Sequence, residues 1–225
     1  METNITKMIG LADIASLLNA ISGMLAIIAS HYQYPIYSAF LLFLAVLFDA
    51  IDGPLAKRYP SPAKEVFGET MDSLADVISF GIAPALILLE LYPTPLMIIA
   101  SILLLSCGIL RLSRYNTIIT EQSGPTTTFI GLPIPVSSFM LSLILLSQIQ
   151  NTTIIAIMMI IIALLMISSF KYPKIKNKAV LAVCVVLLIP TIIYPINHQL
   201  MNIPSILLII FVILYIILPI TKIKI

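Results

Sequence analysis

About eight apolar segments, each close to the length of a membrane-crossing helix, follow one another along the chain. A helix needs about 20 mostly apolar residues to span the hydrocarbon core, where it satisfies its own backbone hydrogen bonds. The sequence therefore predicts an all-α, polytopic transmembrane helical bundle. The predicted spans cover residues 12–30, 34–55, 67–91, 94–112, 132–148, 153–170, 179–196 and 203–220.

The basic residues predict an orientation for these spans. If successive spans alternate in direction, all 12 Lys and Arg residues fall on one side of the membrane. Cytoplasmic loops carry the excess of Lys and Arg, so we expect both termini in the cytoplasm of a multi-pass protein of the cell membrane. The opposite side receives short links that contain both His residues, which we interpret as interfacial.

The amino-acid composition indicates a membrane protein and argues against nucleic acid as a partner. A chain that is 60% hydrophobic and only 10% charged is typical of a membrane protein, and its sequence holds no basic patch interleaved with aromatics that would bind nucleic acid. Cys107 and Cys184 both lie in apolar runs, and we interpret them as small buried hydrophobes.

The stretch 48–81 breaks the apolar pattern, because it holds six of the ten acidic residues. Asp49 and Asp52 are three residues apart, and Asp72 and Asp76 are four apart, so each pair shares one face of a helix. Two prolines between the pairs favour a turn. Two antiparallel helices would then bring four carboxylates together at the mouth of the membrane segment, where uncompensated acids are costly and indicate function.

Four like charges in close proximity repel one another, and divalent cations resolve this conflict. Ligation by oxygen alone suits Mg²⁺, Mn²⁺ or Ca²⁺ rather than Zn²⁺. The number of carboxylates predicts a pair of ions about 3.5–4 Å apart, as in enzymes that catalyse displacement at phosphorus. Gly53, Ala56 and Gly68 would leave the acidic faces open to a bulky diphosphate. The other interpretation, carboxylates that cap helix ends in the headgroup region, would not reproduce both intervals.

The pattern D-x-x-D-G-x-x-A, a basic residue, then G-x-x-x-D-x-x-x-D resembles the signature of the CDP-alcohol phosphotransferases, integral membrane enzymes of phospholipid synthesis. Seven positions carry the resemblance: Asp49, Asp52, Gly53, Ala56, Gly68, Asp72 and Asp76. It implies that the four aspartates bind two divalent cations, Mg²⁺ or Mn²⁺, that Asp76 is the general base, and that the protein is a homodimer. The implied CDP-binding residues are Asp52, Gly53, Ala56, Lys57, Arg58 and Gly68.

The sequence departs from the family pattern at two places. Lys57 stands where the family has Arg, and Arg58 follows it, so either residue is a candidate for the phosphate contact. Pro54 lies inside the motif, where its missing N–H leaves the Ala50 carbonyl without its helical donor and predicts a kink.

Two later segments resemble the phosphatidylserine synthase branch of the family, R-L-S-R-Y-N at 111–116 and F-I-G-L-P-I-P at 129–135. Arg111 and Arg114 share a helix face and are candidates for binding a phosphate or the carboxylate of an acceptor, although snorkelling topology determinants would look the same. Glu65 or Glu69 would meet the ammonium group.

The resemblance implies transfer of a phosphatidyl-type group from CDP-diacylglycerol or CDP-archaeol to L-serine, with release of CMP. Glycerol phosphate or inositol phosphate as acceptor would call for more Lys and Arg around the pocket. A cation transporter would place acids on several distant helices. We expect residues 1–148 to form the catalytic core and residues 149–225 to complete the same membrane domain.

The first span carries polar residues among apolar neighbours, with Asp13 and Ser16 at its start and Asn19 further in. The amide of Asn19 either bonds a neighbouring helix or belongs to the nucleotide site.

Overall fold

The computed structural model describes residues 4–59, 65–121, 128–173 and 203–221, and the description below concerns these residues. The elements are α1 (Ile5–Met8), α2 (Leu11–His31), α3 (Pro35–Arg58), α4 (Glu65–Asp76), the π-helix η1 (Val77–Ile82), α5 (Ala83–Leu91), α6 (Pro95–Glu121), β1 (Thr128–Ile130), α7 (Pro135–Ser147), α8 (Thr152–Met166), β2 (Lys171–Pro173) and α10 (Ile203–Thr221).

Four helical segments are long and apolar enough to cross a membrane, which confirms a membrane-embedded helical protein. They are Leu11–His31, Pro35–Arg58, Val66–Leu91 and Pro95–Ile118. The fifth and sixth predicted spans correspond to α7 and α8, which have 13 and 15 residues and are shorter than a full crossing. The eighth is α10, and the seventh, 179–196, lies outside the described residues.

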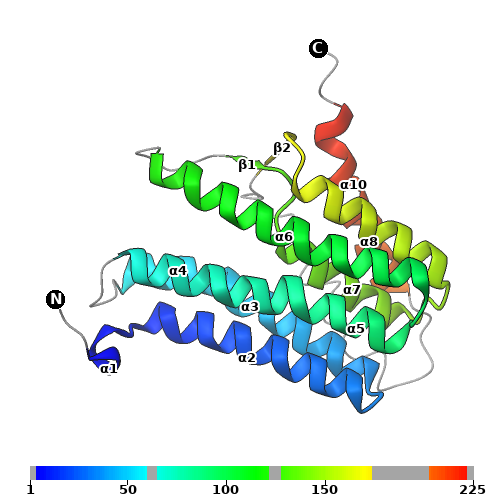
Figure 1. Ribbon diagram of the computed structural model, residues 1–225, viewed down its shortest axis with the longest axis horizontal. Helices are drawn as coiled ribbons and strands as arrows, with labels where there is room; N and C mark the ends of the chain where they lie inside the picture. The colour runs from blue at the N-terminus through cyan, green and yellow to red at the C-terminus, as the bar shows by residue number, and fades with distance from the viewer. Residues whose placement is uncertain (1–3, 60–64, 122–127, 174–202, 222–225) are drawn as a thin grey trace.

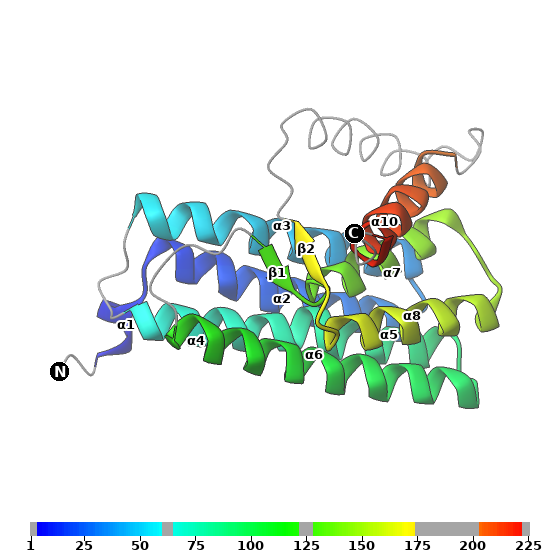
Figure 2. The same cartoon turned by 90° about the horizontal axis from the view of Figure 1, so that it is seen from above.

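The long helices lie side by side along the long axis of the molecule (Figure 1). The start of α2, the end of α3, the start of α4 and the end of α6 gather at the same end, on the left in both views, whereas α8 runs beside α6 only over the other part of its length (Figures 1 and 2). The segments that carry the acidic motif therefore meet at one end of the bundle, as the alternation of spans predicts.

Serine hydroxyls tie the buried parts of these helices together. Ser38 Oγ donates to Ala26 O at 2.9 Å, Ser142 Oγ to Ala39 O at 2.8 Å, and Ser101 Oγ to Ala85 O at 3.0 Å. The alanine acceptors are fully or largely buried. Close backbone approach at small residues, with hydroxyl bonds across the contact, is how helices associate where lipid offers no hydrophobic drive.

The π-helix η1 follows the acidic helix α4 directly, and Pro84 accounts for its unusual hydrogen bonding. Ala83 N donates to Ile78 O, five residues back. Pro84 has no N–H, so the carbonyls of Ser79 and Phe80 receive no main-chain donor from it. Two serines of α7 donate to these carbonyls: Ser138 Oγ bonds Ser79 O and Ser137 Oγ bonds Phe80 O, each at 2.6 Å. Single π-turns inside α-helices occur frequently at functional sites.

The short β1–β2 pair was not predicted from the sequence. Thr128–Ile130 pairs antiparallel with Lys171–Pro173, and Phe129 stands opposite Tyr172. The pair lies beyond the C-terminal end of α8 (Figure 1), on the side of α6 away from α4. It brings the segment after α6 against the segment after α8.

Candidate active site

Three of the four predicted aspartates meet at one point. Asp49 and Asp52 come from α3 and Asp72 from α4, and one carboxylate oxygen from each lies within 4.8 Å of the others. All three side chains are half-buried. Both helices pack on α2, and the three- and four-residue spacings turn the acids of α3 and α4 toward one another above it, as predicted.

Asp76 lies deeper, one turn further along the chain, and only 6% of it is exposed. Its carboxyl group is within hydrogen-bonding reach of that of Asp49, and those of Asp52 and Asp72 are likewise adjacent. All four carboxyl groups therefore form one continuous cluster. Carboxylates this close repel one another unless cations or protons intervene.

The cluster fits a divalent cation. The atoms of the cluster that could bind a metal are all carboxylate oxygens, which are the ligands that suit Mg²⁺ or Mn²⁺. Asp72 Oδ1 is buried and has no hydrogen-bond partner among the described residues, although buried polar atoms are normally paired. A buried carboxylate oxygen without a partner, on one member of the group of three acids, is a suitable metal ligand.

Helix α2 supports the acids of both neighbouring helices. Ser16 Oγ donates to Asp52 Oδ2 at 3.1 Å, and Asn19 Nδ2 donates to Asp76 Oδ1 at 3.2 Å. Ser79 Oγ in turn donates to the main-chain oxygen of Asn19 at 2.8 Å. The expectation that the Asn19 amide bonds a neighbouring helix is confirmed. Since its partner is Asp76, the same residue also belongs to the site.

Gly68 lies against α2, because a Cβ atom at this position would be 3.2 Å from Asp13 Oδ1. Asp13 is 2% exposed and accepts a hydrogen bond from Gly10 N at 2.7 Å, so it caps the start of α2. The small residue of the motif thus allows the acidic helix α4 to pack closely on α2.

The remaining members of the predicted CDP-binding set lie on the last two turns of α3. Gly53, Ala56, Lys57 and Arg58 are exposed, and nothing lies within 4 Å of a Cβ built on Gly53. The guanidinium of Arg58 lies 5.6 Å from the ring centroid of Tyr59. Helix α3 continues through Pro54 as a single helix to Arg58.

Arg111 lies on α6 between two aromatic rings and close to the acids. Its guanidinium carbon is 5.2 Å from the ring centroid of Tyr115 and 5.9 Å from that of Phe129. The side chain is 6% exposed, and its charge interacts with those of Asp76 and Asp49. Among the described residues its N–H groups donate no hydrogen bond within the chain, so this guanidinium beside the acids remains available to a ligand.

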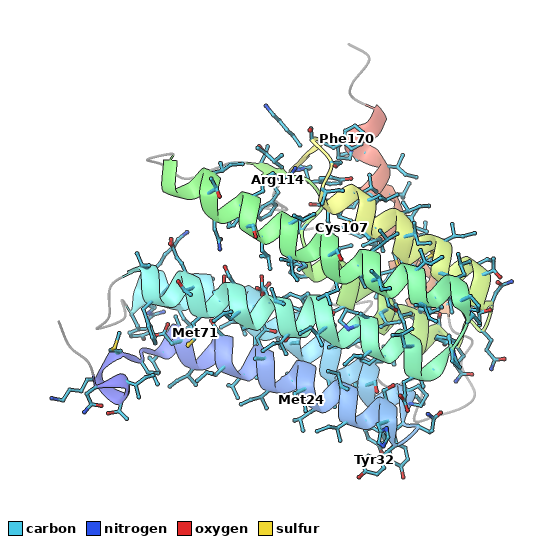
Figure 3. All side chains as sticks on the ribbon, viewed as in Figure 1. Met24, Tyr32, Met71, Cys107, Arg114 and Phe170 are labelled. Atoms are coloured by element: carbon cyan, nitrogen blue, oxygen red, sulfur yellow. The ribbon has the colours of Figure 1, made fainter. Side chains whose placement is uncertain are left out.

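Arg114 is placed differently, although it is only three residues away. Figure 3 labels it on the side of α6 that faces the β1–β2 pair. Its guanidinium donates four hydrogen bonds of 2.9–3.1 Å, all to main-chain carbonyls. The acceptors are Ile130, Met166, Ile167 and Ser168.

One of the two glutamates predicted to meet the acceptor's ammonium group lies near the acidic cluster. Glu69 is exposed on α4, one turn before Asp72, and its charge acts on that residue. The side chain of Glu65 lies outside the described part of the structure. Tyr115 and Phe129, which flank Arg111, were missed by the sequence analysis because no periodicity links an aromatic after the loop to one on α6.

The chain is similar to several proteins of known name. It is 41% identical over 143 residues to the archaetidylserine synthase of Methanothermobacter thermautotrophicus, covering 63% of this chain and 60% of that protein. It is 36% identical over 138 residues to the CDP-diacylglycerol–serine O-phosphatidyltransferase of Methanocaldococcus jannaschii, covering 61% of each. The Bacillus subtilis protein of the same name is 38% identical over 143 residues, which cover 62% of this chain and 76% of that protein.

The match therefore spans about three fifths of the length of the two archaeal relatives. A sequence profile of the CDP-alcohol phosphatidyltransferase family matches residues 9–168, from the start of α2 through the end of α8. This range contains the whole acidic cluster, its supporting residues on α2 and both arginines of α6. The resemblance found in the sequence is thereby confirmed: the protein belongs to the CDP-alcohol phosphatidyltransferase family.

Proposed function

We propose that the protein transfers a phosphatidyl-type group from a CDP-linked lipid, CDP-diacylglycerol or CDP-archaeol, to L-serine and releases CMP. One observation carries the proposal: the acidic cluster on α3 and α4 lies beside the largely buried Arg111, whose charge interacts with the acids and whose N–H groups donate no hydrogen bond to the described residues. The names of the relatives, which are serine transferases or an archaetidylserine synthase, favour the same acceptor.

The acids have two roles in this proposal. Asp49, Asp52 and Asp72, together with Asp76, would hold two divalent cations, Mg²⁺ or Mn²⁺. When bound, such cations would neutralise the diphosphate and stabilise the leaving CMP. Asp76 would accept the proton of the serine hydroxyl as the new oxygen–phosphorus bond forms and the bond from phosphorus to the oxygen of CMP breaks.

The nucleotide would lie along the end of α3. The open space beside Gly53 and the exposure of Ala56 leave a path for a diphosphate toward the acids. Successive residues of a helix are turned by about 100°, so Lys57 lies nearer to the acidic face of α3 than Arg58 does. We therefore assign the phosphate contact within the motif to Lys57 and a peripheral role to Arg58.

Arg111 would bind the carboxylate of serine. Its planar guanidinium suits a two-pronged contact with a carboxylate, and its position between two rings limits its freedom before substrate arrives. We assign no direct substrate contact to Arg114, because four of its donors are occupied by main-chain carbonyls. Glu69, exposed beside Asp72, is the candidate for the ammonium group.

The proposed setting is a multi-pass protein with about eight spans, both termini and the active site at the cytoplasmic face, and a homodimer as the assembly. All Lys and Arg residues fall on that side in the predicted topology. The two substrates also favour an interfacial site, because the lipid arrives from the bilayer and serine arrives from water.

A phosphorylated acceptor would bring a dianion and would need further cationic groups beside Arg111. A cation transporter is disfavoured because the clustered acids lie at one end of the bundle and not on distant helices near the midplane.

The test uses purified full-length protein in lipid vesicles with Mn²⁺ or Mg²⁺ and either CDP-linked lipid. CMP release is measured with L-serine, serinamide, glycerol 3-phosphate, inositol phosphate or no acceptor. We expect release that depends on L-serine, abolished in Asp76→Asn and retained in Glu90→Gln, a carboxylate at the other end of the bundle. Arg111→Met should raise the KM for L-serine but not for serinamide, which lacks the carboxylate. CMP release with a phosphorylated acceptor alone would refute the assignment of serine.

A further inference from the structure

We propose that Arg114 is a positioning residue that fixes Arg111 through the β1 segment and thereby sets the affinity for the acceptor's carboxylate. This inference rests on the proposed function, in which Arg111 binds that carboxylate. In this inference β1, a segment outside the acidic motif, orients Arg111 before the acceptor binds.

Arg114 joins the end of α8 to the start of the segment that leads into α7. Its Nη1 donates to Ile167 O at 3.1 Å and to Ser168 O at 3.0 Å. Its Nη2 donates to Ile130 O and Met166 O, each at 2.9 Å. The last carbonyls of a helix lack intrahelical donors and carry partial negative charge, so a guanidinium is well suited to them. The Ile130 carbonyl is the only one of the four that belongs to β1.

Gly131 permits this arrangement. Its φ of 77° lies in the left-handed region, and a Cβ atom there would collide with Met166 O and with the Nη2 of Arg114. Only glycine accepts both conditions without strain. Gly131 N also donates to Phe170 O at 2.8 Å, which fixes the same turn from the other side.

Phe129 transmits this fixation to Arg111. The residue belongs to β1, where it pairs with Tyr172 of β2, and it is followed directly by Ile130, whose carbonyl Arg114 holds. Its ring lies 5.9 Å from the guanidinium carbon of Arg111 and 6.4 Å from the ring of Tyr115. The guanidinium of Arg111 therefore has one aromatic neighbour on its own helix and one on a strand that Arg114 anchors. Contacts of this kind favour one orientation of the cation over the ring faces.

The two arginines, which are three residues apart, therefore have different roles. Arg111 lies beside the acids with its N–H groups unused by the described residues, whereas Arg114 donates to the main-chain carbonyls that position the second ring. Loss of Arg114 would remove the side-chain link between β1 and the end of α8 and leave only main-chain bonds there, so Phe129 would be less well fixed and Arg111 would sample other rotamers. The affinity for the acceptor would therefore fall. The acidic cluster on α3 and α4 would keep its geometry, because α2 supports it.

The test compares Arg114→Met and Arg114→Lys with the wild-type protein, all full length in vesicles. We expect the KM for L-serine to rise about 10–100-fold, since a misplacement of about 1 Å can cost about a hundredfold. The KM for the CDP-linked lipid and kcat should stay within about twofold of the wild-type values, since the loss is confined to the acceptor side. Lys retains the charge but has no planar fork to serve four carbonyls, so it should reproduce most of the loss. Ser113→Ala is the control, because its exposed hydroxyl bonds only Ile109 O of its own helix.

A double-variant cycle separates positioning from general stabilisation. If Arg114 acts through Arg111, its substitution should have no further effect on the serine KM in an Arg111→Met background. Additive effects, or a parallel change in kcat and in both KM values, would overturn the inference. So would unchanged kinetics in both Arg114 variants. If Arg114→Met does not fold, as its melting temperature would reveal, Arg114→Lys alone decides. A wild-type protein that releases no CMP with serine would instead overturn the proposed function.

Discussion

Replacement of Asn19 by Ala tests how the deepest carboxylate is held. Asn19 is fully buried and donates one hydrogen bond, 3.2 Å long, to the largely buried Asp76. Hydrogen bonds to charged groups contribute about 1.5–3 kcal/mol. The distance is at the long limit of the normal range, so we take the lower end of that interval. At about 1.4 kcal/mol per factor of ten, the expected loss is roughly tenfold in kcat.

An independent estimate agrees, because loss of residues that orient catalytic or metal-bound groups typically costs about 10–100-fold in activity. CMP release under saturating serine and CDP-linked lipid measures kcat directly. Ser22→Ala is the matched control, since Ser22 is also buried on α2 but bonds only Leu18 O of its own helix, at 2.7 Å. Its kcat should stay at the wild-type value.

Two results would count against this reasoning. A kcat of Asn19→Ala within about twofold of the control would mean that the bond does not orient Asp76. An unchanged kcat with a raised KM for the CDP-linked lipid would instead assign Asn19 to the nucleotide, the other interpretation of its place in the sequence. Melting temperatures of both variants, measured alongside, separate these outcomes from loss of the fold.

Three further outcomes are expected. Chelation of divalent cations should abolish CMP release reversibly, and activity that persists in excess chelator would refute a metal site. Asp72→Asn should weaken the activating affinity for Mn²⁺ by about 100-fold or more in a metal titration, because Asp72 is itself a proposed ligand and loss of a residue that only supports a ligand already costs about 10–100-fold. Gly23→Ala should reduce the free energy of unfolding by about 1–3 kcal/mol and lower the melting temperature by several degrees. The reason is that its Cβ would lie 2.6 Å from Ser79 Oγ and 2.8 Å from Ser79 Cα. Gly53→Ala is the control, because its Cβ meets nothing within 4 Å, and it should melt as the wild type does. In a background without native cysteines, an impermeant maleimide should label Glu90→Cys in intact cells and Thr70→Cys only after permeabilisation, and the reverse pattern would invert the proposed orientation.

The acidic site was predictable because its information is local. Asp49, Asp52, Asp72 and Asp76 follow helical spacing, and the connection between their helices is short, so sequence distance translates directly into spatial proximity. The same holds for the long apolar helices. The support from α2 was only partly predictable, since the sequence places Asn19 among apolar residues but does not say which neighbour its amide meets.

The acceptor side depends on contacts that no local rule encodes. Arg111 and Arg114 share a helix face and a charge, and only the pairing of β1 with β2 and the end of α8 distinguish them. The lengths of α7 and α8 were overestimated for a simpler reason. Both apolar runs begin or end in residues that interrupt a helix: α7 starts at Pro135 and stops at Gln148, which has a φ of 56°, and α8 stops before Ser168 and Ser169. The π-helix could have been suspected from Pro84, whose missing N–H must be compensated.

The β1–β2 pairing also has a consequence for biosynthesis. Helices α2 to α6 precede it in the chain, so the carboxylates and the residues that support them can come together while translation continues. The ring of Phe129 gains its fixed place only after Lys171–Pro173 has left the ribosome. A nascent chain halted after α6 and before β2 would therefore contain all the acidic ligands. It would still lack the ordered aromatic ring that helps to form the binding position for the amino acid.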